Sequence, residues 1–230
     1  MPQKNLASVE PRASAVYLID RPGAPQSFIM AGHLVAPKAN PDEVALGTAN
    51  YILGGNFNSR LNMNLREDKH WSYGARTLIF DARGQRPFIA YAGVQSDRTK
   101  ESLAEVLKEL RGIIGANPPT ADELQRARSG QTLTLPGRWE TNRAVLGSLD
   151  EIVTFGLPAD YWSTYADRVN ALELEQVRQA ARQLVHPEHV IWVVVGDREK
   201  IEAGMRELGL GEVHLIDADG NPVVRTAAGD

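Results

Sequence analysis

The sequence predicts an α+β fold, with an antiparallel or mixed β-sheet and helices packed on one face. Three observations support this class. Segments with the two-residue alternation of strands gather near the two ends of the chain. Longer segments with helical spacing lie mostly between them. One hairpin pattern joins two alternating segments directly. Because strands and helices do not alternate strictly along the chain, a wholly parallel α/β sheet is disfavoured.

The length and composition predict one domain preceded by a short tether. The chain has 230 residues, of which 43% are hydrophobic, so it can form a sizeable core. Residues 1–14 are polar and contain two prolines, which is typical of a linker. We therefore expect a linker over residues 1–14 and a single domain over residues 15–230.

The strands are predicted from alternating or short apolar runs that end at turn residues. The first run ends in Arg-Pro-Gly, and the hairpin turn contains Gly84. A fully apolar run near the C-terminus predicts a buried strand. The predicted strands are Ala15–Asp20, Gln26–Val35, Ser72–Phe80, Pro87–Val94, Val190–Val195 and Glu212–Ile216.

The helices are predicted from apolar spacing and from their end residues. Thr120 and Glu123 form a capping-box pattern that opens one helix, and Pro187 ends another. The segment Asp97–Ile114 has a continuous apolar stripe. The other predicted helices are Asp42–Leu53, Asn58–Asp68, Asn142–Phe155, Ala159–Val169, Leu174–Val185 and a last one that ends at Leu208.

Charge and composition exclude several classes of partner. The net charge is −4, so no basic surface for nucleic acid is indicated. No apolar run approaches the ~20 residues of a membrane span. There are no cysteines, which excludes disulfides and thiol chemistry. The absence of cysteine is compatible with an oxidising periplasm and equally with a cytosol. The N-terminus lacks an apolar signal-peptide core, so an exported protein would need a longer precursor. With such a precursor, we favour a bacterial periplasmic location over a cytoplasmic one.

Metal and phosphate sites are not indicated. A zinc helix requires two histidines one turn apart beside a glutamate, and none of the five histidines has that spacing. His186 and His189 flank a proline and are best interpreted as part of a polar loop. Gly54-Gly55 lacks the lysine and hydroxyl residue of a phosphate loop. We therefore expect no metal ligands and no cofactor in this chain.

Arg66 and Tyr73 are the best candidates for chemistry. A guanidinium and a neutral phenol can both donate hydrogen bonds to a polarised carbonyl oxygen. The alternative is purely structural. In that interpretation Arg66 pairs with Glu67 or Asp68 on an exposed helix, and Tyr73 fills the sheet.

The stretch from Leu53 to Ala75 contains, in order, Gly54-Gly55, Ser59-Arg60-Leu61, Arg66-Glu67 and Trp71-Ser72-Tyr73-Gly74. The segment "RPGAPQSFIMAGH" precedes it, and "TADELQRARSG" and "VIWVVVGD" follow it. With these motifs in this order, the chain resembles the non-catalytic half of the pitrilysin/insulinase family of zinc metallopeptidases, which includes mitochondrial processing peptidase.

The resemblance implies a processing-peptidase-like half that lacks its own zinc. In the family, one half carries a His-x-x-Glu-His motif and binds zinc, while the other lends an Arg and a Tyr to the substrate at the scissile bond. The helix that would carry the motif here, DEVALGTANYIL, contains no histidine. The resemblance therefore implies that Arg66 and Tyr73 bind a peptide substrate, with Asn58 and Ser59 in the turn that positions them.

The implied partner is a catalytic zinc-binding half, either fused to this chain or separate. Zinc and the general base would come from that half, so the chain alone would be inactive. The alternative is an inactive structural paralogue that serves as a protein-assembly subunit, like the core subunits of respiratory complexes. Retention of both Arg66 and Tyr73 favours the peptidase interpretation.

Overall fold

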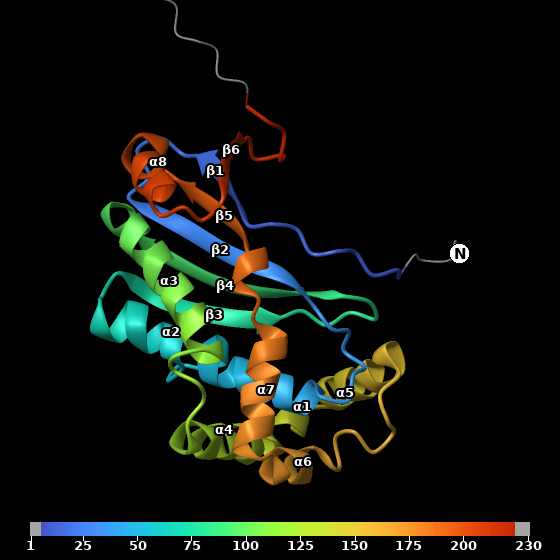
Figure 1. The fold of residues 1–230 in the computed structure, drawn as a ribbon. Coiled ribbons are helices and arrows are strands. Elements are labelled where there is room, and N and C mark those ends of the chain that lie inside the picture. The colour runs from blue at the N-terminus through green and yellow to red at the C-terminus, as the bar shows by residue number, and fades with distance from the viewer. Residues whose placement is uncertain (1–5, 224–230) are drawn as a thin grey trace, which may run out of the picture.

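A computed structural model of the chain describes residues 6–223 and shows one six-stranded sheet with helices packed against it (Figure 1). The strand order is β3-β4-β2-β5-β1-β6. The strands are β1 (Ala15–Asp20), β2 (Gln26–Val35), β3 (Ser72–Ile79), β4 (Arg86–Gln95), β5 (Ile191–Gly196) and β6 (Glu212–Ile216).

The sheet is mixed. β2 pairs antiparallel with both β4 and β5, whereas β1 pairs parallel with β5 and β6. The hairpin of β3 and β4 is antiparallel, as predicted. An α+β fold with a mixed sheet is therefore confirmed.

The helices fall into regular α-helices and short π and 3₁₀ segments. The α-helices are α1 (Glu43–Asn50), α2 (Arg60–Asn62), α3 (Thr99–Ile114), α4 (Ala121–Leu133), α5 (Asn142–Phe155), α6 (Tyr165–Ala171), α7 (Leu174–Leu184) and α8 (Arg198–Glu207). The π segments are η1 (Tyr51–Gly55) and η2 (Met63–Asp68), and the 3₁₀ segments are η3 (Ser96–Arg98), η4 (Pro136–Trp139) and η5 (Pro187–His189).

One predicted helix is shorter than expected. The segment predicted over Ala159–Val169 becomes helical only at Tyr165. The hydroxyls of Ser163 and Thr164 both donate to the carbonyl of Asp160, at 3.0 and 2.9 Å. Such side-chain bonds to the local backbone compete with helix formation, so they hold this segment as a turn.

The sheet has one covered face and one open face. Residues that point toward the helices, such as Val16, Ile29 and Val194, are fully buried. Their neighbours along the strands point the other way, and several of these are large and exposed. The exposed hydrophobic residues on the open face include Phe28, Leu34 and Leu78. This alternation is what a sheet with helices on one face requires.

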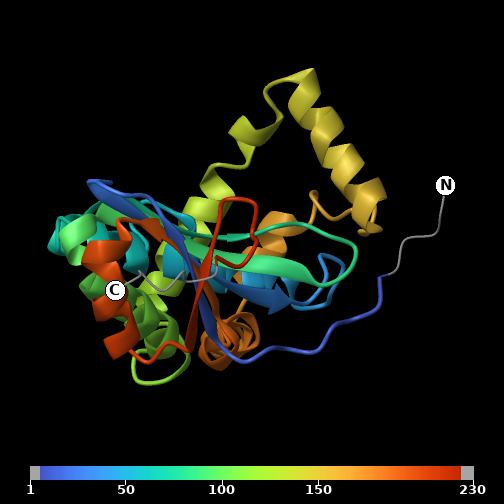
Figure 2. The same cartoon turned by 90° about the horizontal axis from the view of Figure 1, so that it is seen from above.

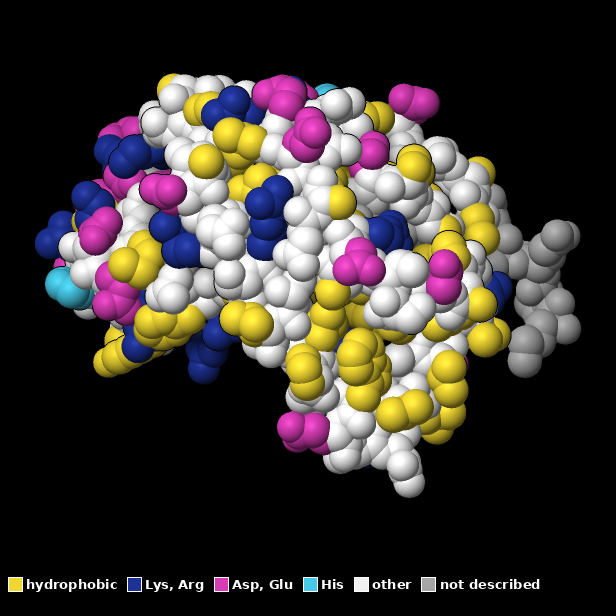
Figure 3. Space-filling model, turned by 90° about the horizontal axis from the view of Figure 1, so that it is seen from below, with side chains coloured by type: hydrophobic (Ala, Val, Ile, Leu, Met, Phe, Trp, Pro, Cys, Tyr) yellow, Lys and Arg dark blue, Asp and Glu magenta, His cyan; other side chains and the backbone are white. Residues whose placement is uncertain are grey.

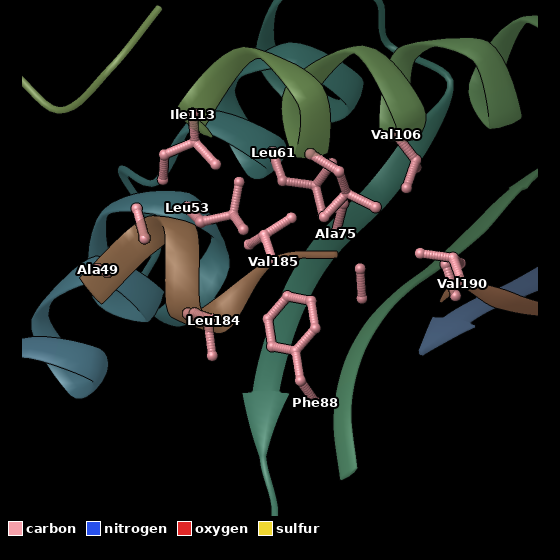
Figure 4. Packing of buried hydrophobic residues seen from close by; sticks show 14 of the residues in the cluster. Ala49, Leu53, Leu61, Ala75, Phe88, Val106, Ile113, Leu184, Val185 and Val190 are labelled. Atoms are coloured by element: carbon pink, nitrogen blue, oxygen red, sulfur yellow. The ribbon is translucent and has the colours of Figure 1, made fainter. Parts of the chain in front are cut away.

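The core lies between the sheet and the helices (Figure 4). Leu53 from η1, Leu61 from α2 and Ile113 from α3 converge with Val185, which directly follows α7. Phe88 on β4 forms part of the floor of this cluster. The helices that carry the candidate site are thus fixed on the sheet by apolar packing.

The N-terminal segment before β1 is irregular over residues 6–14. The backbone N–H of Val9 donates to Gln85 Oε1 at 2.6 Å, and the Gln85 amide donates back to the Val9 carbonyl at 3.2 Å. β1 begins at Ala15, but the linker over residues 1–14 and the single domain over residues 15–230 stay predictions. Residues 1–5 and 224–230 lie outside the described residues. Within residues 6–223, no helix is both long and apolar enough to cross a bilayer.

Candidate functional site

The candidate site lies where η1, α2 and η2 pack against the start of β3. Gly54 permits this close approach. A Cβ atom on Gly54 would lie 2.5 Å from both the backbone nitrogen and Oγ1 of Thr77. Only glycine allows η1 to end directly against β3. The predicted helix of Asp42–Leu53 therefore continues through this glycine pair as η1 rather than ending before it.

A tight turn follows η1 and leads into α2. The Asn58 N–H donates to Asn56 Oδ1 at 2.8 Å, and Ser59 Oγ donates to the Asn56 carbonyl at 2.6 Å. Asn58 is exposed, whereas Ser59 is only 1% exposed. The Ser59 hydroxyl therefore stabilises the turn, and of these two predicted substrate-binding residues only Asn58 faces solvent.

Arg66 lies on η2 with a partly exposed side chain. Its Nε is 3.3 Å from Glu67 Oε1, which is the ion pair that the structural interpretation expects. Its guanidinium also lies over the ring of Phe57, with Cζ 4.5 Å from the ring centre. Arg66 is therefore held loosely by one carboxylate and one aromatic face, and its donors are not enclosed.

Tyr73 stands on a β-bulge and is 88% exposed. The bulge falls between Ser72 and Ala75, where β3 has one residue more than its partner β4. Ser72 Oγ fixes the bulge, since it donates to the Gly93 carbonyl at 2.7 Å and accepts the Gly74 N–H at 3.0 Å. Tyr73 does not fill the sheet, so that part of the structural interpretation is wrong.

Asn62 joins the turn before α2 to strand β3, a role that the sequence patterns did not predict. Its Nδ2 donates to the Phe57 carbonyl at 2.7 Å, and its Oδ1 accepts the Ala75 N–H at 3.1 Å. The side chain is buried. The available clue was an asparagine between the apolar positions Leu61 and Leu65 of one helix, where a polar side chain needs a buried partner.

A short connection links Arg66 to Tyr73. The Trp71 N–H donates to the Leu65 carbonyl at 3.0 Å, and His70 adopts a positive φ of 59°. Within residues 6–223, no hydrogen bond joins Arg66 to Tyr73, and the Tyr73 hydroxyl forms none. The two donors therefore lie on either side of the junction between η2 and β3, and each is available to bind a ligand.

The histidines do not assemble a metal site in the part of the chain that the structure describes, where no group of three His, Asp or Glu side chains could hold an ion. His186 and His189 lie 3.8 and 3.7 Å from Glu188. His33 is buried near them, and its Nε2 accepts the backbone N–H of His186 at 3.2 Å. Burial lowers the pKa of His33 to about 4, so this imidazole is neutral at pH 7.

Comparison with known proteins gives consistent matches. The family described as "Peptidase M16 inactive domain" matches residues 2–131, more than half of the chain. A protein named "Uncharacterized zinc protease YmxG" from Bacillus subtilis is 24% identical over 158 residues, which cover 63% of this chain and 35% of that protein.

Two solved structures illustrate the likeness in fold. A peptidase M16 inactive domain from Pseudomonas fluorescens has a TM-score of 0.75 and 24% identity, covering 83% of this chain and 46% of that one. A chain of complex III2 from Candida albicans has a TM-score of 0.67 and 14% identity, covering 86% and 49%.

The chain thus spans about a third of the curated relative and just under half of these two solved chains. The resemblance to the pitrilysin/insulinase type of peptidase is confirmed. On the extent of the family match, the chain belongs to the peptidase M16 inactive domain family.

Proposed function

We propose that this chain is the non-catalytic half of a zinc metalloendopeptidase. It closes a peptide-binding chamber and brings Arg66 and Tyr73 to the substrate at the scissile bond. Zinc and the general base come from a companion half, either fused or separate. Membership of the inactive-domain family supports the pairing, because a domain of this kind has no use as a peptidase by itself.

The exposure of Tyr73 is the observation that carries the proposal. A tyrosine that is 88% exposed, on a bulge fixed by Ser72, contributes little to the core. Its phenol is free to donate to a ligand. A peptide carbonyl becomes more negative in the transition state of hydrolysis, so positioned donors stabilise that state more than the substrate.

Arg66 complements this donor with a positive charge. Its planar guanidinium offers several N–H groups in a fixed arrangement, which suits a carbonyl or carboxylate oxygen. Its ion pair with Glu67 is near the surface and is weak enough to be exchanged for substrate, while the Phe57 ring supports one face of the guanidinium. Water activation requires zinc and a base, which the companion half would supply.

Two apolar surfaces support docking of a companion half. Helix α5 projects from the rest of the fold, on the side of the sheet opposite α3 and α7 (Figure 2). Leu146, Leu149 and Val153 recur on one face of α5 and are 66, 56 and 76% exposed. Hydrophobic side chains gather on this projecting lobe at the lower right of Figure 3. Together with the open sheet face, this helix gives the chain two groups of large exposed apolar side chains, and such groups commonly mark protein–protein contacts.

The deciding experiment is peptide hydrolysis by the chain assembled with its companion half. Tyr73→Phe removes one hydroxyl and should lower kcat by roughly a hundred- to a thousand-fold while the fold is retained. Arg66→Lys should also lower kcat, because an ammonium cannot reproduce the planar fork. Tyr17→Phe is the matched control: Tyr17 lies on β1 away from Arg66 and Tyr73, and although its ring is on the open face of the sheet, loss of its hydroxyl should leave kcat of the assembled enzyme unchanged. Wild-type turnover by folded Tyr73→Phe would contradict the proposal.

A second function, that of an assembly subunit without substrate work, is favoured by the likeness in fold to the Candida albicans complex III2 chain. The same kinetic experiment separates the two functions. If the chain is an assembly subunit, Tyr73→Phe and Arg66→Lys should both bind the partner normally, and neither should lower kcat. In either case the isolated chain is expected to show negligible peptidase activity. Metal analysis that found one tightly held zinc per isolated chain would contradict the division of labour proposed here.

A further inference from the structure

A buried lysine joins three separate parts of the fold. Lys38 lies in the loop between β2 and α1 and is 8% exposed. Its Nζ is 3.3 Å from Glu43 Oε1, 3.2 Å from Asp81 Oδ2 and 3.1 Å from Glu151 Oε1. These carboxylates come from α1, from the connection between β3 and β4, and from α5. Arg86 adds a second buried cation that binds Glu43 and Asp81.

The charge on Lys38 is stable in this setting. Burial alone would lower its pKa, but the carboxylates around it, with Glu43 foremost, outweigh burial and raise the pKa above its ordinary value. A buried cation and its carboxylates depend on each other, because losing one partner leaves the other charged and desolvated. Lys38 therefore fixes the relative positions of the segments that meet on it.

Helix α5 depends on this lysine more than the other segments do. Ser148 is the one residue of α5 that is buried, so apolar packing holds this helix weakly. Within residues 6–223, its polar contacts beyond η4, which binds Ser148 and Glu151, are the Lys38–Glu151 ion pair to the β2–α1 loop and a hydrogen bond from the Arg83 guanidinium on the β3–β4 connection to the Thr154 carbonyl. By contrast, α1 and β4 are anchored in the core.

We infer that Lys38 is a positioning residue that sets the orientation of α5 through Glu151. The orientation matters because the exposed face of Leu146, Leu149 and Val153 can meet a companion surface only if the helix is held at a defined angle. This last step rests on the proposed function, whereas the effect of Lys38 on α5 can be measured in this chain alone.

The test compares two carboxylates that bind the same lysine. Glu151→Gln removes the carboxylate on α5, whereas Asp81→Asn removes one on the β3–β4 connection and also disturbs Arg86. Lys38→Met would remove the shared cation of three carboxylates and leave them only Arg86 and Arg138, so it is expected to destabilise the whole domain and is a poor probe of α5 alone. Hydrogen exchange is measured for the amides of α5, α1 and β4 in the folded chain.

Glu151→Gln should raise exchange across α5 about tenfold while α1 and β4 keep their protection. Asp81→Asn should leave α5 at the wild-type rate. Glu151 also binds Arg138 at 3.0 Å, so Arg138→Gln serves as a further control that keeps the lysine contact. Arg138→Gln should raise α5 exchange less than Glu151→Gln does. Unchanged α5 exchange in Glu151→Gln, or an equal rise in Asp81→Asn, would overturn the inference.

A second measurement separates this inference from the proposed function. Leu149→Asp damages the docking face without touching Lys38, and its affinity for the companion half is compared with that of Glu151→Gln. Weaker binding in both variants supports the positioning of a docking helix. If Leu149→Asp binds normally while Glu151→Gln still raises exchange, the docking proposal fails and the role of Lys38 stands.

Discussion

The guanidinium of Arg66 lies over the ring of Phe57, with 4.5 Å between Arg66 Cζ and the ring centre. Phe57 belongs to the turn before α2, and its own carbonyl is bound by Asn62. The Phe57 ring in the turn before α2 thus supports the guanidinium of Arg66, nine residues later in the chain. This contact gives Arg66 an orientation that does not depend on its ion pair with Glu67.

Phe57→Leu should therefore impair function more than folding. A cation–π contact near the surface contributes about 0.5–1 kcal/mol, so losing it should lower kcat of the assembled enzyme about two- to fivefold. The free energy of unfolding should change by a similar or smaller amount, since Phe57 is half exposed. Met63→Leu is a suitable control, because Met63 is exposed nearby and carries no aromatic ring for a cation to lie over. Equal kinetics in both variants would show that the ring does not orient Arg66.

Asn62→Ala should destabilise the domain. The substitution leaves the Phe57 carbonyl and the Ala75 N–H without their buried partner, at a cost of about 2–4 kcal/mol in the free energy of unfolding. Urea denaturation measures this. Asn58→Ala, whose exposed side chain forms no bond among the described residues, should stay within about 0.5 kcal/mol. A loss for Asn62→Ala no greater than for Asn58→Ala would show that water replaces both bonds.

Gly54→Ala should also destabilise, for a steric reason. The new methyl group would lie 2.5 Å from the Thr77 backbone, which cannot yield without disturbing β3. Overpacking of this kind costs about 1–3 kcal/mol. Gly47→Ala is the matched control on the preceding helix, where a Cβ meets nothing within 4 Å. It should be neutral or stabilising by up to about 1 kcal/mol, because alanine is the better helix former. The thermal midpoints of the two variants give the comparison, and a Gly54→Ala midpoint at or above that of the wild type would contradict this packing.

His33 should make stability depend on pH in a defined window. Burial lowers its pKa from 6.5 to about 4. Between these pH values the imidazole is therefore protonated in the unfolded chain but neutral in the folded chain. The folded state is therefore most stable, as far as His33 is concerned, above pH 6.5, and it loses this stability as the pH falls toward 4. The loss should amount to about 3 kcal/mol in the free energy of unfolding.

Urea denaturation at neutral pH and at about pH 4 would show the His33 effect. The titratable groups that face His33 are His186, His189 and Glu188. Burial has the largest effect on the pKa of His33, and the charges of these three groups shift it less. His33→Gln should remove most of this difference between the two conditions, whereas His214→Gln, at the partly exposed edge strand β6, should keep it. The same pH dependence in His33→Gln as in the wild type would assign the effect to other groups.

Patterns that depend on neighbouring residues were read correctly from the sequence. The bounds of β1, β2, α5 and β6 agree with the predicted ranges, because a two-residue or 3.6-residue apolar repeat is set locally. The capping box at Thr120 and Glu123 is present for the same reason, since both of its bonds join residues three apart. The family resemblance rested on equally local motifs.

Other features were decided by contacts between distant residues. Parallel pairing of β1 with β5 joins residues more than 170 positions apart, and no local pattern specifies that partner. The bulge that exposes Tyr73 depends on Ser72 meeting Gly93, and the support of Arg66 depends on a turn held by Asn62. The sequence by itself determined the elements and the candidate donors. The tertiary structure decided that Tyr73 faces solvent and Ser59 does not, because burial is a property of what packs against a residue.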